Sequence, residues 1–299
     1  MSAQPREPSP LDPPRHLVRD AVARAIAEDV GSLGDITSAL VDAGAHATAD
    51  VVVRAEGVLA GTACATEAFA QIDPTVDVGW RVDDGAAVSA STVVATVGGS
   101  LRSILTAERT ALNFLCHLSG VATATRRFVD ALGGSAQVAD TRKTLPGLRA
   151  LEKAAVRAGG GVNHRGSLSD MVLLKDNHLG RLGITDAVVQ ARARWPGRGI
   201  EVECENADQV LEALDAGAHL VMLDNMTPDE AQKCVGIVRD SAWPDVLIEL
   251  SGGVTLENVR AYADAGVDII STSAITQSAP ALDIALDVTG ANGPKRARR

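Results

Sequence analysis

The chain has 299 residues, 46% of them apolar, and its 28 Lys and Arg against 38 Asp and Glu give a net charge of −10. The acidic excess argues against a nucleic-acid partner, which usually needs a broad basic face, and no apolar run reaches the roughly 20 residues that cross a bilayer. Four cysteines lie far apart without a CxxC pair, so we expect reduced thiols in a cytoplasmic protein with no membrane partner, rather than disulfides or a zinc site.

The two ends of the chain differ in composition from the rest. Residues 1–14 hold five prolines and lack the apolar stretch of a secretory signal, which predicts a disordered leader. Residues 291–299 end in KRARR, and a short charged end of this kind is typical of a solvated segment. We therefore expect a basic flexible tail there.

The segment 15–115 predicts an N-terminal α+β domain. Three stretches, DVVVRAEGVLAG, VDVGWRVDDGAAV and STVVATVGG, have the β-branched character of strands and are joined by Gly and Asp turns. A long helix is expected through SILTAERTALNFLCHLSGVATATRRFVDAL, with the domain boundary inside it. Residues 276–290 are expected to pack on this first domain.

The segment 116–275 repeats one unit, a short apolar run followed by an amphipathic helix. Six such runs occur: AQVADT, MVLLKDNH, IEVECEN, HLVMLDN, VLIELSGG and VDIISTSA. Continuous apolar strands that alternate with helices indicate a parallel sheet covered on its faces. Fold frequency favours a (β/α) barrel over an open sheet. The predicted class is therefore α/β, an irregular (β/α) barrel preceded by a smaller α+β domain.

Helix signals agree with this pattern. Asp208 and the pair Thr227 and Pro228 suit helix starts, and Gly217 and Gly266 suit helix ends. The cations Arg149, Lys153 and Arg157 lie at helical spacing with Glu152, which predicts a solvated helix face rather than a binding site.

Positive charge gathers between residues 139 and 178 of this acidic chain. The stretch holds seven Lys and Arg against four Asp and Glu, plus two histidines. The informative polar side chains of the second half stand just after the predicted strands, where the strand ends of a barrel form one mouth. They are Thr141, Arg142, Lys143, Lys175, Asp176, Asn177, His178, Glu203, Glu205, Asp224, Asn225, Ser251, Gly252, Gly253, Thr272 and Ser273.

The charges indicate a polyanionic ligand. Several cations in a confined mouth need anionic partners, because an unpaired buried charge is costly. The glycine turn in SGGVTLEN precedes a helix, where backbone amides and the helix dipole suit a phosphate. Glu203 and Asp224 offer the oxygen ligands that bind sugar hydroxyls or a divalent metal. Together these features predict a phosphorylated sugar and leave room for a second anion.

The motifs match a known family. The chain resembles quinolinate phosphoribosyltransferase from about Leu17 to Val288. The resemblance rests on AEDVGSLGDITS, RAEGVLAG, AERTALNFLCHLSGVAT, DTRKTLPGLRALEKAAVRAGGGVNHRGSLSDMVLLKDNH, EVECEN, LDNM, ELSGGV and SAPALDIALD. It implies transfer of the phosphoribosyl group of phosphoribosyl pyrophosphate (PRPP) to the nitrogen of quinolinate. Decarboxylation then gives nicotinate mononucleotide, pyrophosphate and CO2, a step of de novo NAD biosynthesis.

The resemblance also implies the residues of the site. Quinolinate is expected at Arg109, Thr141, Arg142, Lys143, His164, Arg165 and Lys175. PRPP and its phosphates are expected at Lys143, Lys175, Glu203, Asp224, Ser251, Gly252, Gly253, Thr272, Ser273 and Ala274. Lys143, Lys175, Glu203 and Asp224 are the expected catalytic residues, with Glu203 and Asp224 reaching a PRPP-bound Mg²⁺ partly through ribose and water.

The resemblance further implies a homodimer with shared active sites. Arg109 is expected to enter the site of the neighbouring subunit, and Arg54 is a further candidate at the dimer face. The chain departs from the family at one place, because many members have Gly where Ser273 stands.

Three alternatives stay open from the residues. A Schiff-base aldolase could use Lys143 or Lys175 as its nucleophile. A phosphoribosyltransferase could act on another pyridine or base. A degenerate homologue could bind nucleotides as a sensor, although the intact set of cations counts against it.

Overall fold

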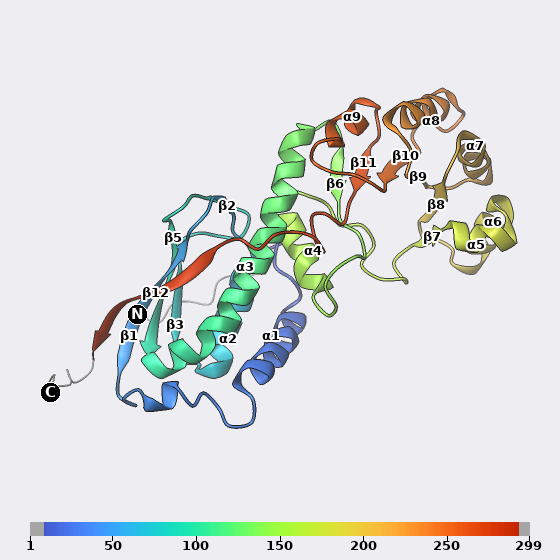
Figure 1. The fold of residues 1–299 in the computed structure, drawn as a ribbon. Helices are drawn as coiled ribbons and strands as arrows, with labels where there is room; N and C mark the ends of the chain where they lie inside the picture. The colour runs from blue at the N-terminus through green and yellow to red at the C-terminus, as the bar shows by residue number, and fades with distance from the viewer. Residues whose placement is uncertain (1–8, 293–299) are drawn as a thin grey trace. The chain divides into compact units, whose positions relative to one another are not determined.

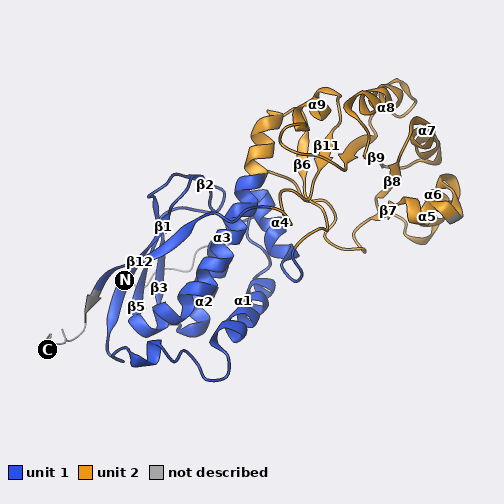
Figure 2. Ribbon diagram, viewed as in Figure 1, with its two compact units in different colours: residues 1–124, 145–160, 279–299 blue, residues 125–144, 161–278 orange. Residues whose placement is uncertain are grey.

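The computed structural model describes residues 9–292, which form two compact units (Figure 1, Figure 2). Unit 1 comprises residues 1–124, 145–160 and 279–299, and unit 2 comprises residues 125–144 and 161–278. Residues 1–8 of the predicted leader and residues 293–299 of the predicted tail lie outside the described residues. None of the helices in the described part of the chain is long and apolar enough to cross a membrane.

Unit 1 is built on an antiparallel sheet of four strands in the order β12-β1-β5-β3. The last strand of the chain pairs with the first along its whole length. In β1, alternate residues from Ala47 to Val53 are buried, which is the period of a strand with one face on a core. The strands are β1 (His46–Val53), β2 (Gly57–Val58), β3 (Asp77–Trp80), β4 (Ala87–Val88), β5 (Val93–Ser100) and β12 (Ile284–Asn292).

The helices of unit 1 include the long helix that the sequence predicts. They are α1 (Arg15–Val30), α2 (Thr62–Ile72), the first part of α3 (Leu101–Leu132) and α4 (Arg149–Ala158), with a 3-10 turn at Ser38–Leu40. The limit between the two units falls inside α3, at residue 124. Helix α4 belongs to unit 1 although it follows the first strand of unit 2 in the sequence.

The prediction of a solvated face on α4 was wrong. Glu152 is fully buried, and only 6% of Lys153 is exposed. The Glu152 carboxylate accepts hydrogen bonds from the His117 ring at 2.9 Å and from the amide of Leu145 at 3.2 Å. Helical spacing alone could not reveal this burial, because the polar partner comes from α3, more than thirty residues earlier.

Unit 2 is a parallel sheet surrounded by helices, in the strand order β6-β11-β10-β9-β8-β7. Its strands are β6 (Gln137–Ala139), β7 (Val172–Leu174), β8 (Ile200–Cys204), β9 (Leu220–Asp224), β10 (Leu247–Ser251) and β11 (Ile269–Ser271). Its helices are the end of α3, then α5 (Asp176–Leu182), α6 (Ile184–Arg194), α7 (Ala207–Ala216), α8 (Pro228–Asp240) and α9 (Val259–Asp264).

The strand order is that of a barrel with one open seam. From β7 to β11 each strand pairs with the next in the chain, and β11 pairs with β6, the first. Val162 adds a parallel bridge to the free edge of β6, at Ala139. Within the described residues no pairing joins Val162 to β7. This arrangement confirms the predicted irregular (β/α) barrel.

The predicted helix signals have the expected geometry. Thr227 and Glu230 exchange hydrogen bonds in a capping box, and Pro228 is the first residue of α8. Gly217 ends α7 with a φ of 85°. Asp208 lies in the first turn of α7, whereas the side chain of Asn206 caps it.

Two helical glycines give a matched test of the packing in each unit. A Cβ on Gly120 in α3 would lie 2.1 Å from the carbonyl oxygen of Pro280, whereas nothing lies within 4 Å of a Cβ on Gly236 in α8. Gly120→Ala should destabilise the protein by at least about 2 kcal/mol, because backbone must move. Gly236→Ala should stabilise it by about 0.5–1 kcal/mol through its higher helix propensity. Urea unfolding of both variants measures the difference, and equal midpoints would contradict this packing.

Candidate active site

The carboxyl ends of the unit 2 strands lie level with one another. Ser271 is in register with Ala139 on one side and with Ser251 on the other, and Ser251 is in register with Asp224. The polar residues that follow the strands are therefore gathered at one edge of the sheet, as the barrel prediction requires.

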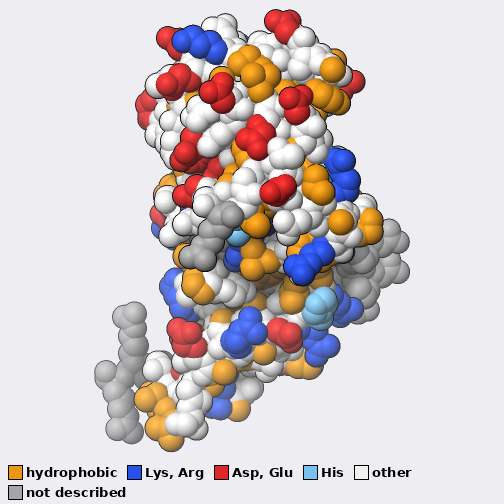
Figure 3. Space-filling view, turned by 90° about the vertical axis from the view of Figure 1, so that its right-hand side faces the viewer, with side chains coloured by type: hydrophobic (Ala, Val, Ile, Leu, Met, Phe, Trp, Pro, Cys, Tyr) orange, Lys and Arg blue, Asp and Glu red, His pale blue; other side chains and the backbone are white. Residues whose placement is uncertain are grey.

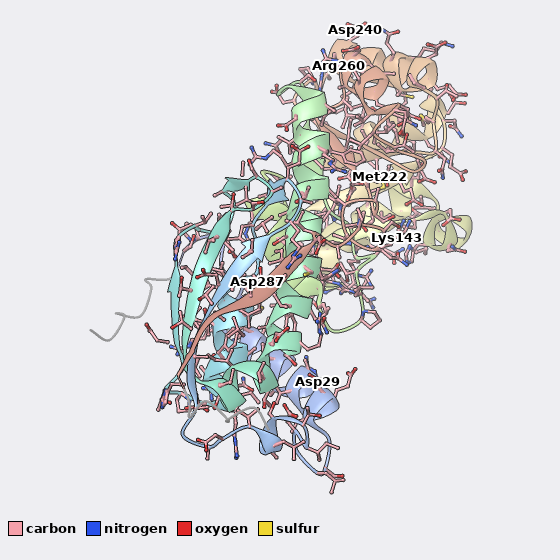
Figure 4. All side chains as sticks on the ribbon, turned by 60° about the vertical axis from the view of Figure 1, so that its left-hand side comes forward. Asp29, Lys143, Met222, Asp240, Arg260 and Asp287 are labelled. Atoms are coloured by element: carbon pink, nitrogen blue, oxygen red, sulfur yellow. The ribbon has the colours of Figure 1, made fainter. Side chains whose placement is uncertain are left out.

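A row of long side chains crosses the sheet just before this edge. Glu203 on β8 and Glu249 on β10 are both in register with Met222 on β9, which is labelled in Figure 4. Glu201 lies two residues before Glu203, so the two carboxylates share a face of β8. Asp and Glu side chains are numerous on the surface drawn in Figure 3, but Glu201, Glu203 and Glu249 are buried.

Lys175 and Glu203 form an ion pair. Lys175 directly follows β7, and its Nζ donates to Oε2 of Glu203. The carboxylate side chain is 9% exposed and the lysine side chain 42%. The amide of Lys175 also donates to Nδ1 of His178 at 3.1 Å. His178 therefore supports the backbone at Lys175, in keeping with its exclusion from the predicted binding residues.

The segment after β6 carries Thr141, Arg142 and Lys143. The amide of Lys143 donates to Oγ1 of Thr141 at 2.9 Å, and the carbonyl of Lys143 accepts from Oγ1 of Thr276 at 2.8 Å. Thr276 is 1% exposed, so it anchors this segment from within unit 2. Thr276 was not among the predicted site residues, because a lone threonine carries no sequence signal.

Asp140 holds a second segment against the end of β6. Its carboxylate accepts from Nδ2 of Asn163 at 2.6 Å and from the amide of His164 at 3.0 Å, and Asp140 is fully buried. Because Val162 bridges to β6, the residues from Asn163 to Arg165 also stand at a strand end. The sequence prediction missed Asp140, since a one-residue bridge at Val162, directly after three glycines, is too short to recognise as a strand.

Both ring nitrogens of His164 have partners within unit 2. Nδ1 lies 2.7 Å from the amide nitrogen of Arg165. Nε2 lies 3.0 Å from Oε2 of Glu201 and 3.4 Å from Oε2 of Glu249. The prediction that His164 binds a carboxylate of quinolinate stays a prediction. For its ring to bind that carboxylate, the substrate would have to replace one of these hydrogen-bond partners.

Arg165 lies near a second guanidinium. Burial is the main cause that lowers the pKa of Arg165, and the charge of Arg142 lowers it further, while Glu201 and Asp170 act in the opposite direction. A half-buried guanidinium that a second cation opposes is a favourable place for an anion. That Arg142 and Arg165 bind a carboxylate stays a prediction.

The ends of β9 and β10 are locked together by Asn225 and Gly252. Nδ2 of Asn225 donates to Oδ2 of Asp224 at 2.7 Å, and the amide of Asn225 donates to the carbonyl of Ser251 at 2.9 Å. A Cβ on Gly252 would lie 2.1 Å from Oδ1 of Asn225, and Gly252 has a φ of 92°. Only glycine fits there, so Asp224 and the predicted phosphate turn are held in one arrangement.

The second predicted phosphate turn follows β11. The amide of Thr272 donates to the carbonyl of Ala139, and the amide of Ala274 donates to Oγ1 of Thr272, both at 3.2 Å. The amide of Ala274 thus has a partner within the chain, and Ser273 lies between these two fixed residues.

Arg109 and Arg54 belong to unit 1. Arg109 lies on α3, and Nη2 of Arg54 lies 3.1 Å from Oδ1 of Asp287 on β12. The residues that unit 2 itself brings to the carboxyl ends of its strands are Thr141, Arg142, Lys143, His164, Arg165, Lys175, Glu203, Asp224, Ser251, Gly252, Gly253, Thr272, Ser273 and Ala274.

Comparison with known proteins agrees with this arrangement. Residues 35–119 match the model of the quinolinate phosphoribosyl transferase N-terminal domain, and residues 121–287 match that of the C-terminal domain. A Mycobacterium leprae protein named nicotinate-nucleotide pyrophosphorylase [carboxylating] is 45% identical over 276 residues, which cover 90% of this chain and 96% of that protein. A Synechocystis relative named as a probable enzyme of the same kind is 42% identical, over 94% and 96% of the two chains.

A solved structure extends the likeness to the fold. The nicotinate-nucleotide pyrophosphorylase from Francisella tularensis has a TM-score of 0.88 and 38% identity, and the match covers 95% of this chain and 100% of that one. The family models match both halves of the sequence, and the solved structure matches the fold. The chain belongs to the quinolinate phosphoribosyltransferase family.

Proposed function

We propose that this chain transfers the phosphoribosyl group of PRPP to quinolinate and releases nicotinate mononucleotide, pyrophosphate and CO2. The chain is a phosphoribosyltransferase of NAD biosynthesis by its family and by the names of its relatives. The observation that carries the substrate assignment is the pair of neighbouring guanidiniums of Arg142 and Arg165, close to the acidic strand ends of the same sheet.

The cations supply a site for the quinolinate dianion. Arg142 and Arg165 are the proposed ligands of its carboxylates, since a guanidinium can bind a carboxylate through two parallel hydrogen bonds. Lys143 follows β6 and Lys175 follows β7, and we assign both lysines to both substrates. Arg109 is proposed to complete the site from the partner subunit of a homodimer.

The carboxylates suit the ribose and a divalent cation. Glu203 and Asp224 lie at the carboxyl ends of the neighbouring strands β8 and β9, and each already has a donor, Lys175 for Glu203 and Asn225 for Asp224. Hard oxygen ligands of this kind fit Mg²⁺, which when bound would neutralise the pyrophosphate of PRPP. The amides of the turns after β10 and β11 are proposed to hold the phosphates.

The chemistry needs placement of charge more than proton transfer. Cleavage at the anomeric carbon builds positive charge on the ribose, which Glu203 and Asp224 stabilise, while Lys143 and Lys175 stabilise the departing phosphate oxygens. Holding the quinolinate nitrogen against that carbon supplies the remaining advantage. After transfer, the pyridinium nitrogen accepts the electrons that decarboxylation releases, so no strong general base is required.

The aldolase alternative gains no support from the comparisons, because the matched relatives are named as pyrophosphorylases and phosphoribosyltransferases.

The choice of substrate tests the other alternative, a phosphoribosyltransferase that acts on another pyridine or base. Quinolinate should be used at least about a hundredfold better than nicotinate, which lacks the 2-carboxylate and would leave part of the cationic pair without a partner. Mass spectrometry of reactions with PRPP and Mg²⁺ measures nicotinate mononucleotide, and equal turnover of the two acids would refute the assignment.

The placement of PRPP predicts a selective defect. Glu203→Ala and Asp224→Ala should each raise the KM for PRPP at least about tenfold, because each removes a charged contact to ribose or metal. The KM for quinolinate should change much less. Glu205→Ala is the matched control, since Glu205 is an exposed acid directly after β8. Steady-state kinetics at saturating Mg²⁺ decides, and unchanged PRPP kinetics in both variants would contradict the placement.

The shared site predicts complementation between inactive subunits. Arg109→Ala should weaken quinolinate binding by at least about tenfold, because truncating a buried charge partner typically costs about 2–5 kcal/mol. Lys143→Ala should inactivate the site in its own chain. A mixed dimer of the two variants would carry one site with both lesions and one with neither, so activity should return after subunit exchange. Exchange verified by native mass spectrometry without recovered activity would place Arg109 outside the partner's site.

A further inference from the structure

Three side chains inside the unit 2 sheet form a connected group that the proposed reaction does not use. They are Glu249 on β10, Glu201 on β8 and His164 after the Val162 bridge. Glu201 and Glu249 are fully buried, and the His164 side chain is 11% exposed. The group also contacts the backbone of Arg165, a residue proposed to bind quinolinate, because the amide of Arg165 donates to His164.

The hydrogen bonds of His164 determine where its proton lies. The amide of Arg165 donates to Nδ1 at 2.7 Å, so Nδ1 is the ring's acceptor. The ring proton is therefore on Nε2, which donates to Glu201 at 3.0 Å. The same contact disfavours a metal ion held by the histidine and the two carboxylates. A metal on Nε2 would place the ring proton on Nδ1, against the N–H of Arg165.

Both buried carboxylates lie beside the His164 ring, with Oε2 of Glu201 at 3.0 Å and Oε2 of Glu249 at 3.4 Å from Nε2. Neither oxygen of Glu249 has a hydrogen-bond donor of normal geometry among the described residues. Two ionised carboxylates side by side without water are unfavourable. A proton would relieve this repulsion. Nδ1 of His164 cannot take it, because this nitrogen already accepts from the amide of Arg165. We therefore assign the proton to Glu249.

The surroundings of Glu249 agree with a protonated carboxyl. Burial is the largest cause that raises the pKa of Glu249 to about 7, and the neighbouring Glu201 raises it further. His164 from the Val162 segment and Ser271 from β11 lower it in part. Glu249 is therefore neutral below about pH 7 and loses its proton as the pH rises above that value.

We propose that Glu201 and Glu249 are positioning residues for quinolinate. Glu201 fixes the neutral, Nε2-protonated ring of His164, and this ring fixes the backbone of Arg165. The protonated Glu249 limits the negative charge beside that ring. The inference rests on the proposed function, since it concerns binding of the same dianion.

The proposal predicts a pH-dependent affinity. When Glu249 ionises above about pH 7, a second negative charge lies beside His164, in the group that holds the backbone of Arg165, and opposes binding of an anion. The KM for quinolinate should rise about tenfold between pH 6.5 and 8.5 at saturating PRPP. Glu249→Gln has the shape of the protonated side chain and cannot ionise, so its KM should stay low at both pH values. Glu201→Ala should raise the KM at both pH values with a much smaller change in kcat.

A matched control separates this effect from loss of stability. Glu152 is also a fully buried carboxylate that contacts a histidine ring, but it lies in unit 1. Glu152→Gln should therefore keep the wild-type pH dependence of the quinolinate KM, even if its unfolding midpoint falls. The same flat profile in Glu152→Gln and Glu249→Gln would overturn the proposal.

Nitrogen NMR tests the arrangement without substrate. In ¹⁵N-histidine-labelled wild-type protein, the His164 signal, assigned by its loss in His164→Gln, should show a protonated Nε2 and an unprotonated Nδ1 at pH 6.5. Protonation of both nitrogens at that pH would place the proton on His164 and overturn the proposal. A wild-type protein that forms no nicotinate mononucleotide would refute the proposed function instead. The NMR experiment would still show which ring nitrogen of His164 is protonated. It uses wild-type protein, so it does not depend on whether the Glu249→Gln variant folds.

Discussion

The electrostatic cost of placing two guanidiniums near one another is the constraint on which the arrangement of unit 2 depends. Both guanidiniums belong to segments at the carboxyl edge of its parallel sheet. Arg142 and Arg165 repel each other and lose hydration, as the lowered pKa of Arg165 reflects. Such a pair needs an anion, from the chain or from a ligand. The chain supplies part of the compensation through Glu201 and Asp170, and quinolinate is the anion that we propose for the rest.

The neighbouring polar groups are held by the chain before any substrate arrives. Lys175 pairs with Glu203, Asp140 holds the backbone before Arg165, and Asn225 supports Asp224. Each contact fixes a side chain or backbone amide that the proposed reaction uses, so little reorganisation is needed when substrates bind. The cost of burying these charges is offset within the sheet, where partners come from adjacent strands.

The barrel geometry explains why residues from seven separate segments lie at one edge of the sheet. Parallel strands in register place their carboxyl ends at one edge, and the seam beside β7 leaves the Val162 segment attached only to β6 within the described part of the sheet. This segment brings His164 and Arg165 to the same edge as Arg142. The glycines before Val162 permit the close approach, and the buried Asp140 replaces the hydrogen bonds that a longer strand would have made.

The sequence by itself determined the class of fold, the six strands, the long helix and the family, because these depend on local periodicity and on motifs contiguous in the chain. It also indicated the strand-end residues from Thr141 to Ala274, since parallel strands place such residues together wherever they occur. Only the tertiary structure showed that Glu152 is buried against His117, that Asp140 and Thr276 hold strand-end segments, and that Glu201 and Glu249 lie beside His164. An acid within an apolar strand has the same sequence signature whether it faces solvent or a histidine. Its role is decided by partners from distant segments, and their placement depends on packing that no local pattern encodes.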